Sequence, residues 1–354
     1  MTRSTRLVAL VAIAALALIS CARQGSTAAN LKPADIYSAG PSLADVRAVL
    51  GDSNWWQGPP SFEVRPLDAA SIQTTEQFSV AQRFILLGTA EEFLVRYTVY
   101  DKVSSATTFI TDLKKAYGAG TSLYKAGDDV LYLAGSAVGG APYVARTVVR
   151  LGQVIVYIAW ARKDGLPTIQ QMQKNAVKVI KGLKTVLDGK AHASPPKADP
   201  KLLPNPGLDI TYLGSAQLPV EAWVVMTHAA IPGPVVQLLH EMGITDFAYG
   251  DHALNNDTHM EVRSALFTFP SPAAATQWAA TFGPGKPDLS GIDWTYIPTA
   301  GSMEGSGEYH YYFAAGTYGA MLVCASTIGG EAASRACEAP MERVAISWKF
   351  VLGG

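Results

Sequence analysis

Apolar and polar residues alternate along two stretches of the chain with the two-residue period of a β-strand. Residues 93–100 and 261–269 each predict one half-buried strand, because successive side chains of a strand point to opposite faces. Residues 142–160 and 308–324 each predict two strands joined by a tight turn. The glycines at these turns are Gly152 and Gly316.

After each single strand, the spacing of the apolar residues changes to the three and four of an amphipathic helix. One such helix has Ser104 or Ser105 as its cap and closes at Gly118, and the other has the cap Ser271 and closes at Gly283. A final helix follows each hairpin. The apolar residues of these final helices are Met172, Ala176, Val179, Ile180, Leu183 and Leu187 in one, and Met341, Val344, Ala345, Trp348 and Leu352 in the other.

The order of strand, helix, hairpin and final helix therefore occurs twice. We interpret it as an internal duplication that gives an α+β protein of two similar domains, each an antiparallel sheet with helices on one face. Two unrelated α+β domains are the alternative. We expect an N-terminal segment at 1–20, a tether at 21–40, domains at 41–187 and 207–354, and a linker with five prolines at 188–206.

The N-terminal segment has the pattern of a secretory signal. Arg3 and Arg6 precede the apolar residues 7–19, a run too short for a helix that spans a membrane. The run ends in Leu18-Ile19-Ser20-Cys21, which resembles the lipobox of bacterial lipoproteins. An ordinary signal peptide with a chance cysteine is the alternative.

The lipobox resemblance implies cleavage before Cys21, a diacylglycerol thioether on its sulfur and an acylated new N-terminus. More than one buried acyl chain makes such an anchor stable. The protein is then anchored in the cell membrane or outer membrane and exposed outside the cytoplasm. In a host with two membranes, Ala22 after the cysteine favours the outer one.

The charge balance argues against a nucleic-acid partner. The chain has 28 basic and 29 acidic residues, and cleavage of the signal removes two of the basic ones. A nearly neutral chain lacks the basic face that is typical of nucleic-acid binding. For the same reason, we expect no polybasic patch for anionic lipid.

Cysteine use fits an oxidising compartment. With Cys21 acylated, Cys324 and Cys337 remain as a pair, and we expect a disulfide between them. Closing this short loop stabilises the fold by roughly 3 kcal/mol on the chain-entropy estimate. Two free thiols are the alternative, and a metal pair is disfavoured because no CxxC or CxxH motif accompanies them.

The twofold plan resembles the compact α+β modules, some of them PsbP-like, of bacterial envelope lipoproteins. The C-terminal half also resembles the extracellular sensor domains of actinobacterial serine/threonine kinases, in which cysteines brace the last strand to the last helix. On this plan Cys324 ends the last strand, Cys337 begins the last helix, and Trp160 is the equivalent of Cys324 in the first half. Neither resemblance implies a functional residue.

Gly51-Asp52-Ser53 resembles the nucleophile block of the GDS-type (SGNH) hydrolases. Their chemistry needs a base and an oxyanion hole, which that family supplies through Asp-x-x-His and Gly-x-Asn-Asp motifs. Neither motif occurs here. Residues 42–51 instead predict a helix with the cap Ser42, so we expect a helix end and a turn at Ser53 and keep a small hydrolase as an alternative function.

Histidines are concentrated in the second half, where His252, Asp257 and His259 lie close together in the sequence. Imidazole and carboxylate groups bind zinc and other divalent ions, so these residues are a candidate metal site of a metal-dependent enzyme. Their spacing matches no helical motif such as HExxH, and Asn, Asp and Gly at this density are typical of a surface loop. We favour a solvated loop and expect no metal and no cofactor.

Four aromatic residues are candidate ligand-facing positions. Trp55 and Trp56 either stack on a ligand or cover a core, and we favour the cover. Tyr309 and Tyr311 share one face of a predicted strand, where aromatic residues are also ordinary strand formers.

The sequence thus predicts a non-enzymatic, lipid-anchored envelope protein that binds a small ligand or a partner protein. A site at the interface of the two modules is expected, because sites commonly lie between domains. An enzyme that uses Ser53 or the His252 and His259 region is one alternative, and a structural assembly factor of the cell envelope is another.

Overall fold

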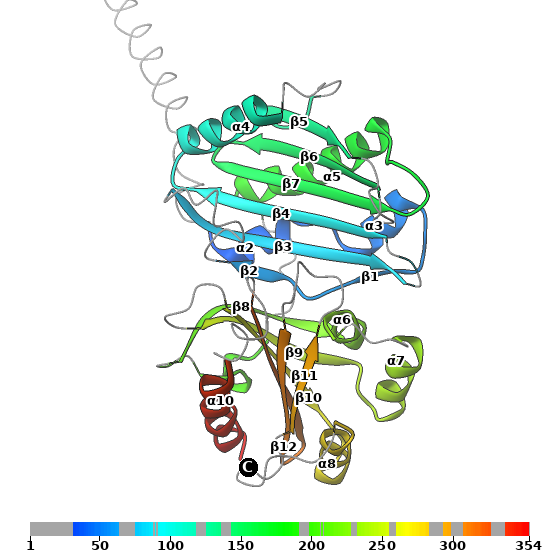
Figure 1. The fold of residues 1–354 in the computed structure, drawn as a ribbon, viewed down its shortest axis with the longest axis vertical. Coiled ribbons are helices and arrows are strands. Elements are labelled where there is room, and N and C mark those ends of the chain that lie inside the picture. Colours follow the sequence, from blue (N-terminus) through cyan, green and yellow to red (C-terminus); the bar gives the residue numbers. More distant parts are fainter. Residues whose placement is uncertain are drawn as a thin grey trace, which may run out of the picture.

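The protein is built from two antiparallel sheets, one in each half of the chain, which lie one above the other along the long axis of the molecule (Figure 1). The predicted α+β class with two antiparallel sheets is confirmed. The computed structural model describes residues 31–63, 75–87, 89, 91–117, 125–135, 143–190, 198–205, 207, 209–227, 232–254, 260–282, 293–298, 307–326 and 337–353. In this part of the chain, no helix has the length and apolar content needed to cross a bilayer.

The first module contains a seven-stranded sheet with the order β1-β3-β4-β7-β6-β5, in which β2 also pairs with β3. Its elements are α2 (Pro33–Ala39), α3 (Leu43–Leu50), β1 (Trp55–Gln57), β2 (Ser61–Glu63), β3 (Glu76–Leu86), β4 (Glu92–Tyr100), α4 (Val103–Tyr117), β5 (Asp129–Ala134), β6 (Tyr143–Leu151), β7 (Val154–Arg162) and α5 (Ile169–Leu187).

The second module contains a six-stranded sheet with the order β8-β9-β10-β13-β12-β11. Its elements are the 3₁₀ turn η3 (Pro200–Leu202), β8 (Ile210–Pro219), α6 (Val220–Met226), α7 (Pro232–Glu241), β9 (Asp246–Leu254), β10 (Met260–Thr268), α8 (Pro272–Ala280), β11 (Asp293–Pro298), β12 (Gly307–Ala315), β13 (Tyr318–Ser326) and α10 (Glu338–Val351).

The six-strand paths of the two sheets have the same order, and from the second strand of each path onward the connections are also the same, whereas β1 reaches β3 through β2 and β8 reaches β9 through α6 and α7. In each, two neighbouring antiparallel strands lead into a helix, and the next three strands return so that the last one pairs with the second. A final helix then follows, α5 in the first module and α10 in the second. This equivalence is what a duplication would produce, and the common origin itself stays a prediction.

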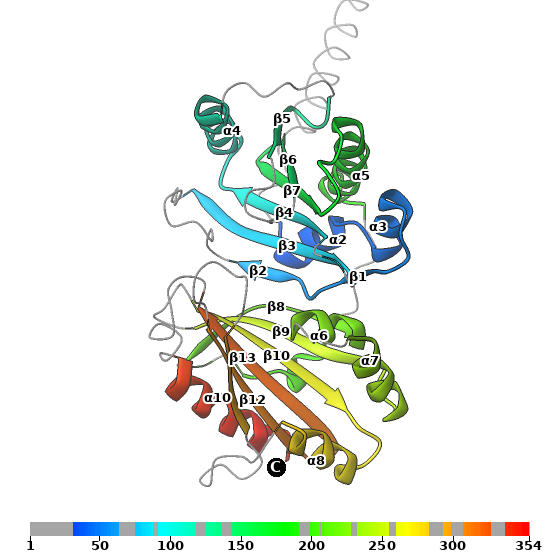
Figure 2. The same cartoon turned by 45° about the vertical axis from the view of Figure 1, so that its right-hand side comes forward.

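The structure corrects one detail of the predicted architecture, because helices cover both faces of each sheet rather than one. In the first sheet, Ile155 lies in the cluster beneath α4, whereas Val154 and Val156 lie in the core on the α5 side (Figure 2). In the second sheet, Val323 belongs to the core on the α8 side and Leu322 to the cluster that contains α10. Central strands that are apolar on both faces need cover on both faces.

Local signals set several element boundaries as predicted. Ser271 caps α8, since its Oγ accepts a hydrogen bond from the backbone N–H of Ala274 and Pro272 is the first helical residue. Gly152 and Gly316 form the hairpin turns with φ of 59° and 55°, a conformation that side chains other than hydrogen disfavour.

The predicted cap of α4 is wrong. The helix begins at Val103, so Ser104 and Ser105 lie inside its first turn. The Ser105 hydroxyl donates to a carboxylate oxygen of Asp101 at 2.6 Å, so it interacts with a side chain and not with a free backbone N–H of the helix.

Two segments expected to be a tether and a linker are partly folded into the modules. Ile36 of α2 is fully buried and α2 packs along α5, so residues 33–39 belong to the first module. Ala198 and Leu203, on either side of η3, are buried in the core beneath α10. Such short segments have too few apolar residues to show a period, which is why the sequence did not indicate their burial.

The two modules share a hydrophobic core. One continuous cluster of buried side chains includes Phe62 of the first module and Trp223 and Phe247 of the second. The Phe62 ring lies directly over Gly214 of β8, where a Cβ atom would come within 2.6 Å of the ring. The modules therefore form one packed body.

Buried hydrogen bonds join the same surfaces. The backbone N–H of Phe62 donates to a carboxylate oxygen of Asp251 at 2.6 Å, and the Tyr249 hydroxyl donates to the Pro60 carbonyl at 2.8 Å. Burial raises the pKa of Tyr249 well above its ordinary value, so this hydroxyl remains a donor. These bonds fix how β2 docks on β8 and β9.

Candidate functional site

A hollow of about 280 Å³ lies between the two modules, and we call it the inter-module hollow. The first module contributes residues of α3 and β1, and the second contributes the junction between β8 and α6. The lining residues are Leu43, Arg47, Trp56, Gln57, Leu218, Pro219, Glu221 and Ala222. Apolar walls with a few polar groups, placed between domains, are typical of small-molecule sites.

The two adjacent tryptophans have different environments. Trp55 is 1% exposed and belongs to the shared core, which agrees with its interpretation as a cover. Trp56 is half-buried and lines the inter-module hollow, because successive side chains of β1 point to opposite sides. Of the two candidates, only Trp56 is placed to touch a ligand.

Opposite charges from the two modules line this hollow. Arg47 of α3 donates through Nε to the Trp55 carbonyl at 3.0 Å, which ties α3 to β1. Glu221 lies in the first turn of α6. Both residues line the hollow, and neither side chain forms a salt bridge with another residue that the structure describes.

A larger hollow of about 530 Å³, the α5 hollow, lies between α5 and the segment that joins α2 to α3. Most of its lining residues have polar side chains. The lining residues are Tyr37, Ser38, Ala39, Gly40, Pro41, Ser42, Asp45, Gln57, Gln82, Lys178, Lys181, Gly182 and Thr185. Gln57 lines both hollows, and its amide donates to the Tyr37 hydroxyl at 3.4 Å.

Gln82 forms part of the base of the α5 hollow. Its amide nitrogen donates to the Tyr37 carbonyl at 2.9 Å, whereas its amide oxygen has no partner among the described residues. Gly40 covers this oxygen so closely that a Cβ atom there would lie 2.0 Å from it. Gln82 therefore holds the α2–α3 segment in place, at the cost of one unsatisfied buried acceptor.

An ion pair stands at the rim of the α5 hollow. Lys178 Nζ lies 2.6 Å from Asp45, whose carboxylate also accepts from the backbone N–H and the hydroxyl of Ser42. Partial burial raises the pKa of Asp45, but the hydrogen bonds from Lys178 and Ser42 outweigh it, and the net pKa lies below its usual value. The Lys178 charge is thus partly neutralised within the fold.

The outer side of α5 carries a lysine face, which we define as Lys174, Lys178, Lys181 and Lys184. All four are exposed, and their spacing places them along one side of the helix. Residues 169–187 contain no aspartate or glutamate. The nearly neutral total charge gives no sign of this face, because it averages over parts of the chain that lie far apart.

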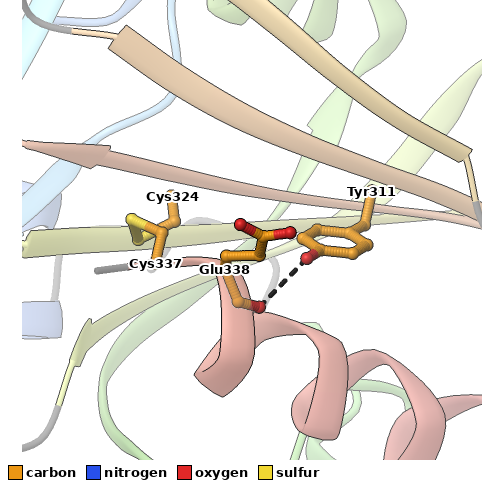
Figure 3. The surroundings of a disulfide bond; sticks show 4 residues. All are labelled: Tyr311, Cys324, Cys337 and Glu338. Atoms are coloured by element: carbon orange, nitrogen blue, oxygen red, sulfur yellow. Dashed lines mark hydrogen bonds between the residues drawn. A yellow bond between two sulfur atoms is a disulfide. The ribbon is translucent and has the colours of Figure 1, made fainter. Parts of the chain in front are cut away.

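The predicted disulfide between Cys324 and Cys337 is present (Figure 3). Both cysteines are fully buried, with Cα atoms 6.0 Å apart. Cys324 lies in β13 and Cys337 directly precedes α10, so the bond attaches the final helix to the sheet. This is a structural role.

Tyr311 does not face a ligand. It is fully buried beside the disulfide, and its hydroxyl donates to the Glu338 carbonyl in the first turn of α10 at 3.0 Å (Figure 3). The side chain of Tyr309 lies outside the described part of the chain. The sequence suggested that Tyr311 lies on a ligand-facing surface of the strand. In the structure Tyr311 is instead part of the core beneath α10.

Ser53 lies in an exposed turn after α3, as expected from the helix pattern. Ser42 caps that helix and Gly51 ends it with a φ of 84°. The Asp52 carboxylate accepts from the backbone N–H of Asn54 at 2.7 Å, so it shapes the turn. No histidine that the structure describes forms a hydrogen bond with Ser53.

Of the three candidate metal ligands, the structure describes only His252. His252 lies fully buried in β9, not in the predicted surface loop, whereas Asp257 and His259 lie outside the described residues. Burial lowers the pKa of His252 to about 4, and the backbone groups of Val262 and Pro204 that face the ring partly oppose this. Among the described residues, no cluster of three or more His, Cys, Asp or Glu side chains is placed to hold a metal ion.

Sequence reasoning missed most of the residues that line the two hollows. Gln82 left a signal, since it lies between the buried apolar residues Val80 and Phe84 on one face of β3. Arg47 and Glu221 left none, because only the docking of the modules brings them together.

Comparisons with known proteins add little. No protein family matches the chain, and no curated protein is similar to it. Among solved structures, the extracellular domain of PknH from Mycobacterium tuberculosis is similar at 12% identity and a TM-score of 0.34, over 44% of this chain and 97% of that domain. A TM-score this low does not establish a shared fold.

Proposed function

We propose that this protein is a lipid-anchored envelope protein, exposed outside the cytoplasm, that binds a small and largely apolar ligand in the inter-module hollow without catalysis. The observation that carries the proposal is the composition of that hollow. Trp56 and Leu218 supply apolar walls from the two modules, and Arg47 and Glu221 supply one charge of each sign. Such a site suits a compact molecule with an apolar body and a polar end.

The lipid anchor is a separate part of the proposal, supported by the lipobox pattern at Cys21. Intact-mass measurement of the protein purified from its native membrane tests it. An acylated N-terminus at Cys21 is the expected result, and an unmodified N-terminus at another residue would refute it.

Ligand binding is tested with the fluorescent probe 1-anilinonaphthalene-8-sulfonate, which combines an apolar ring system with one anionic group. We expect saturable binding that Trp56→Ala weakens about tenfold, because a stacked aromatic wall is lost. Leu43→Trp should block the hollow, whereas Leu238→Trp, at an exposed position of α7 outside the hollow, should bind as the parent does.

Small molecules released from the natively purified protein provide the second readout. A compound that mass spectrometry finds with the parent and with Leu238→Trp, but not with Leu43→Trp, supports the site. Equal probe affinity for the parent, Trp56→Ala and Leu43→Trp, together with no released compound, would refute it.

A partner protein is the second candidate, and one observation favours it. α10 exposes Ile346, Phe350 and Val351, and Phe350 is 79% exposed. Exposed apolar groups of this kind on a single helix mark contact surfaces more often than isolated apolar residues do. Sedimentation of the parent and of Phe350→Ser tests whether this helix mediates self-association.

A further inference from the structure

We propose that the lysine face of α5 lies against the anionic headgroups of a bilayer and sets the orientation of the protein on the membrane. The inference takes the membrane location from the proposed function. The attraction to anionic lipid depends only on the charges of α5. The membrane-binding inference and the proposed ligand binding can therefore be refuted independently.

The first argument is charge. Lys174, Lys181 and Lys184 form no ion pair within the described residues, and α5 contains no acidic residue that could neutralise them. Lys178 is the exception, because Asp45 pairs with it. Asp188, directly after the helix, pairs with Lys190, so three lysines of α5 have no ion-pair partner among the described residues although the whole chain is nearly neutral. Clustered lysines are drawn to anionic lipid, and their attraction falls off within a Debye length of the surface.

The second argument is the position of the N-terminal segment. The described chain begins at Leu31 and enters α2, which packs along α5 on the side of the sheet opposite α4 (Figure 2). Residues 22–32 span at most about 40 Å when fully extended. An anchor at Cys21 therefore keeps the start of α2, which packs along α5, within about 40 Å of the bilayer.

The third argument is the shape and composition of the surface. The α5 hollow opens beside Lys178 and Lys181, and its polar lining includes Ser42 and Thr185. A phospholipid headgroup offers a phosphate to the lysines and polar oxygens to the hydroxyls. Val177, half exposed on the same side of α5, adds an apolar side chain to this surface.

The test uses the mature chain, residues 21–354, with Cys21→Ser so that no lipid contributes. Sedimentation measures its binding to vesicles of phosphatidylcholine alone and of phosphatidylcholine with 30% phosphatidylglycerol. We expect binding only to the anionic vesicles and a steep loss as sodium chloride rises from about 50 to 300 mM.

Charge variants locate the contact. Each lysine near an anionic surface is worth roughly a fivefold change in binding, so Lys174→Gln, Lys181→Gln and Lys184→Gln together should weaken it about 100-fold. Lys178 is left intact because it holds Asp45. The matched control removes the same charge from the α4 side with Lys102→Gln, Lys115→Gln and Lys125→Gln, all exposed, and should bind as the parent does.

Three results would overturn the inference. Equal weakening by both triple variants would mean that total charge, not the lysine face, drives binding. Equal binding to neutral and anionic vesicles, or binding to soluble polyglutamate but not to vesicles, would exclude an anionic bilayer as the partner. Neither result bears on the inter-module hollow, whose probe-binding test uses no lipid.

Discussion

The contact of Phe62 with Gly214 makes a sharp test of the idea that the two modules share one core. The Phe62 side chain is 3% exposed, and its ring occupies the space into which a side chain at position 214 would point. A Cβ atom at Gly214 would lie 2.6, 2.7 and 2.8 Å from three ring carbons. Gly214→Ala must therefore push the ring out of its place.

The magnitudes follow from packing. Overfilling a well-packed core costs about 1–3 kcal/mol, which is the expected loss for Gly214→Ala. Removing a buried phenylalanine ring costs about 3–5 kcal/mol, which is the expected loss for Phe62→Ala. In the double variant the alanine at position 214 no longer meets a ring, so the second substitution should cost almost nothing.

Urea unfolding followed by circular dichroism measures these free energies, with unchanged m values as the condition for comparing them. We expect the double variant to be about 1–3 kcal/mol more stable than the sum of the single changes predicts. Gly207→Ala, where a Cβ atom meets no neighbour within 4 Å, is the control and should change stability by less than about 0.5 kcal/mol. Effects that add to within about 0.5 kcal/mol would show that the ring and the glycine do not touch, and the shared core would then be refuted at this point.

Three further predictions concern stability. Replacing Cys324 and Cys337 together by alanine should lower the free energy of unfolding by roughly 3 kcal/mol, because the loop of 13 residues becomes free in the unfolded chain; thermal melts of the parent and variant check this. Burial lowers the pKa of His252 to about 4 in the fold, whereas in the unfolded chain this histidine takes up a proton near pH 6.5. Protonation therefore favours the unfolded chain, and the free energy of unfolding, which is highest above pH 6.5, falls by about 3 kcal/mol as the pH drops to 4. Unfolding curves from pH 4 to 8 should show this loss for the parent, and an equal slope in His252→Gln would contradict it. Tyr249→Phe should cost about 1–3 kcal/mol in urea unfolding, because the buried Pro60 carbonyl loses its donor, and no change would mean that water replaces the hydroxyl.

Local chemistry made part of the fold predictable. Ser271 followed by Pro272 starts a helix by satisfying its free N–H groups, and Gly316 adopts a turn that other residues avoid, so neighbouring residues alone decide both features. The Cys324–Cys337 bond was also predictable, because Cys21 was expected to be acylated and only these two cysteines remained to pair. Signals of this kind need no knowledge of what packs where.

The sequence pattern did not predict which faces of the sheets the helices cover or how the two modules dock. Residues 154–160 are apolar on both sides of the strand, and a run without a period does not reveal that helices cover both faces. Trp55 and Trp56 look alike in the sequence, yet only the docking of α3 and α6 decides that one is buried and the other lines a hollow. The lysines of α5 are present in the sequence, but the nearly neutral total charge gave no sign that they form one exposed face.

The shared core also decides how independent the halves are. A protease cut or an engineered break in the segment that connects α5 to η3 would sever the chain without separating the modules, because Phe62, Trp223 and their neighbours still bury one another. Each half made alone would expose the surface that the other covers and should aggregate, whereas the two halves produced together should assemble into one particle. Two genes could then encode what is now a single polypeptide, and fragment complementation in one cell is the experiment that would reveal it.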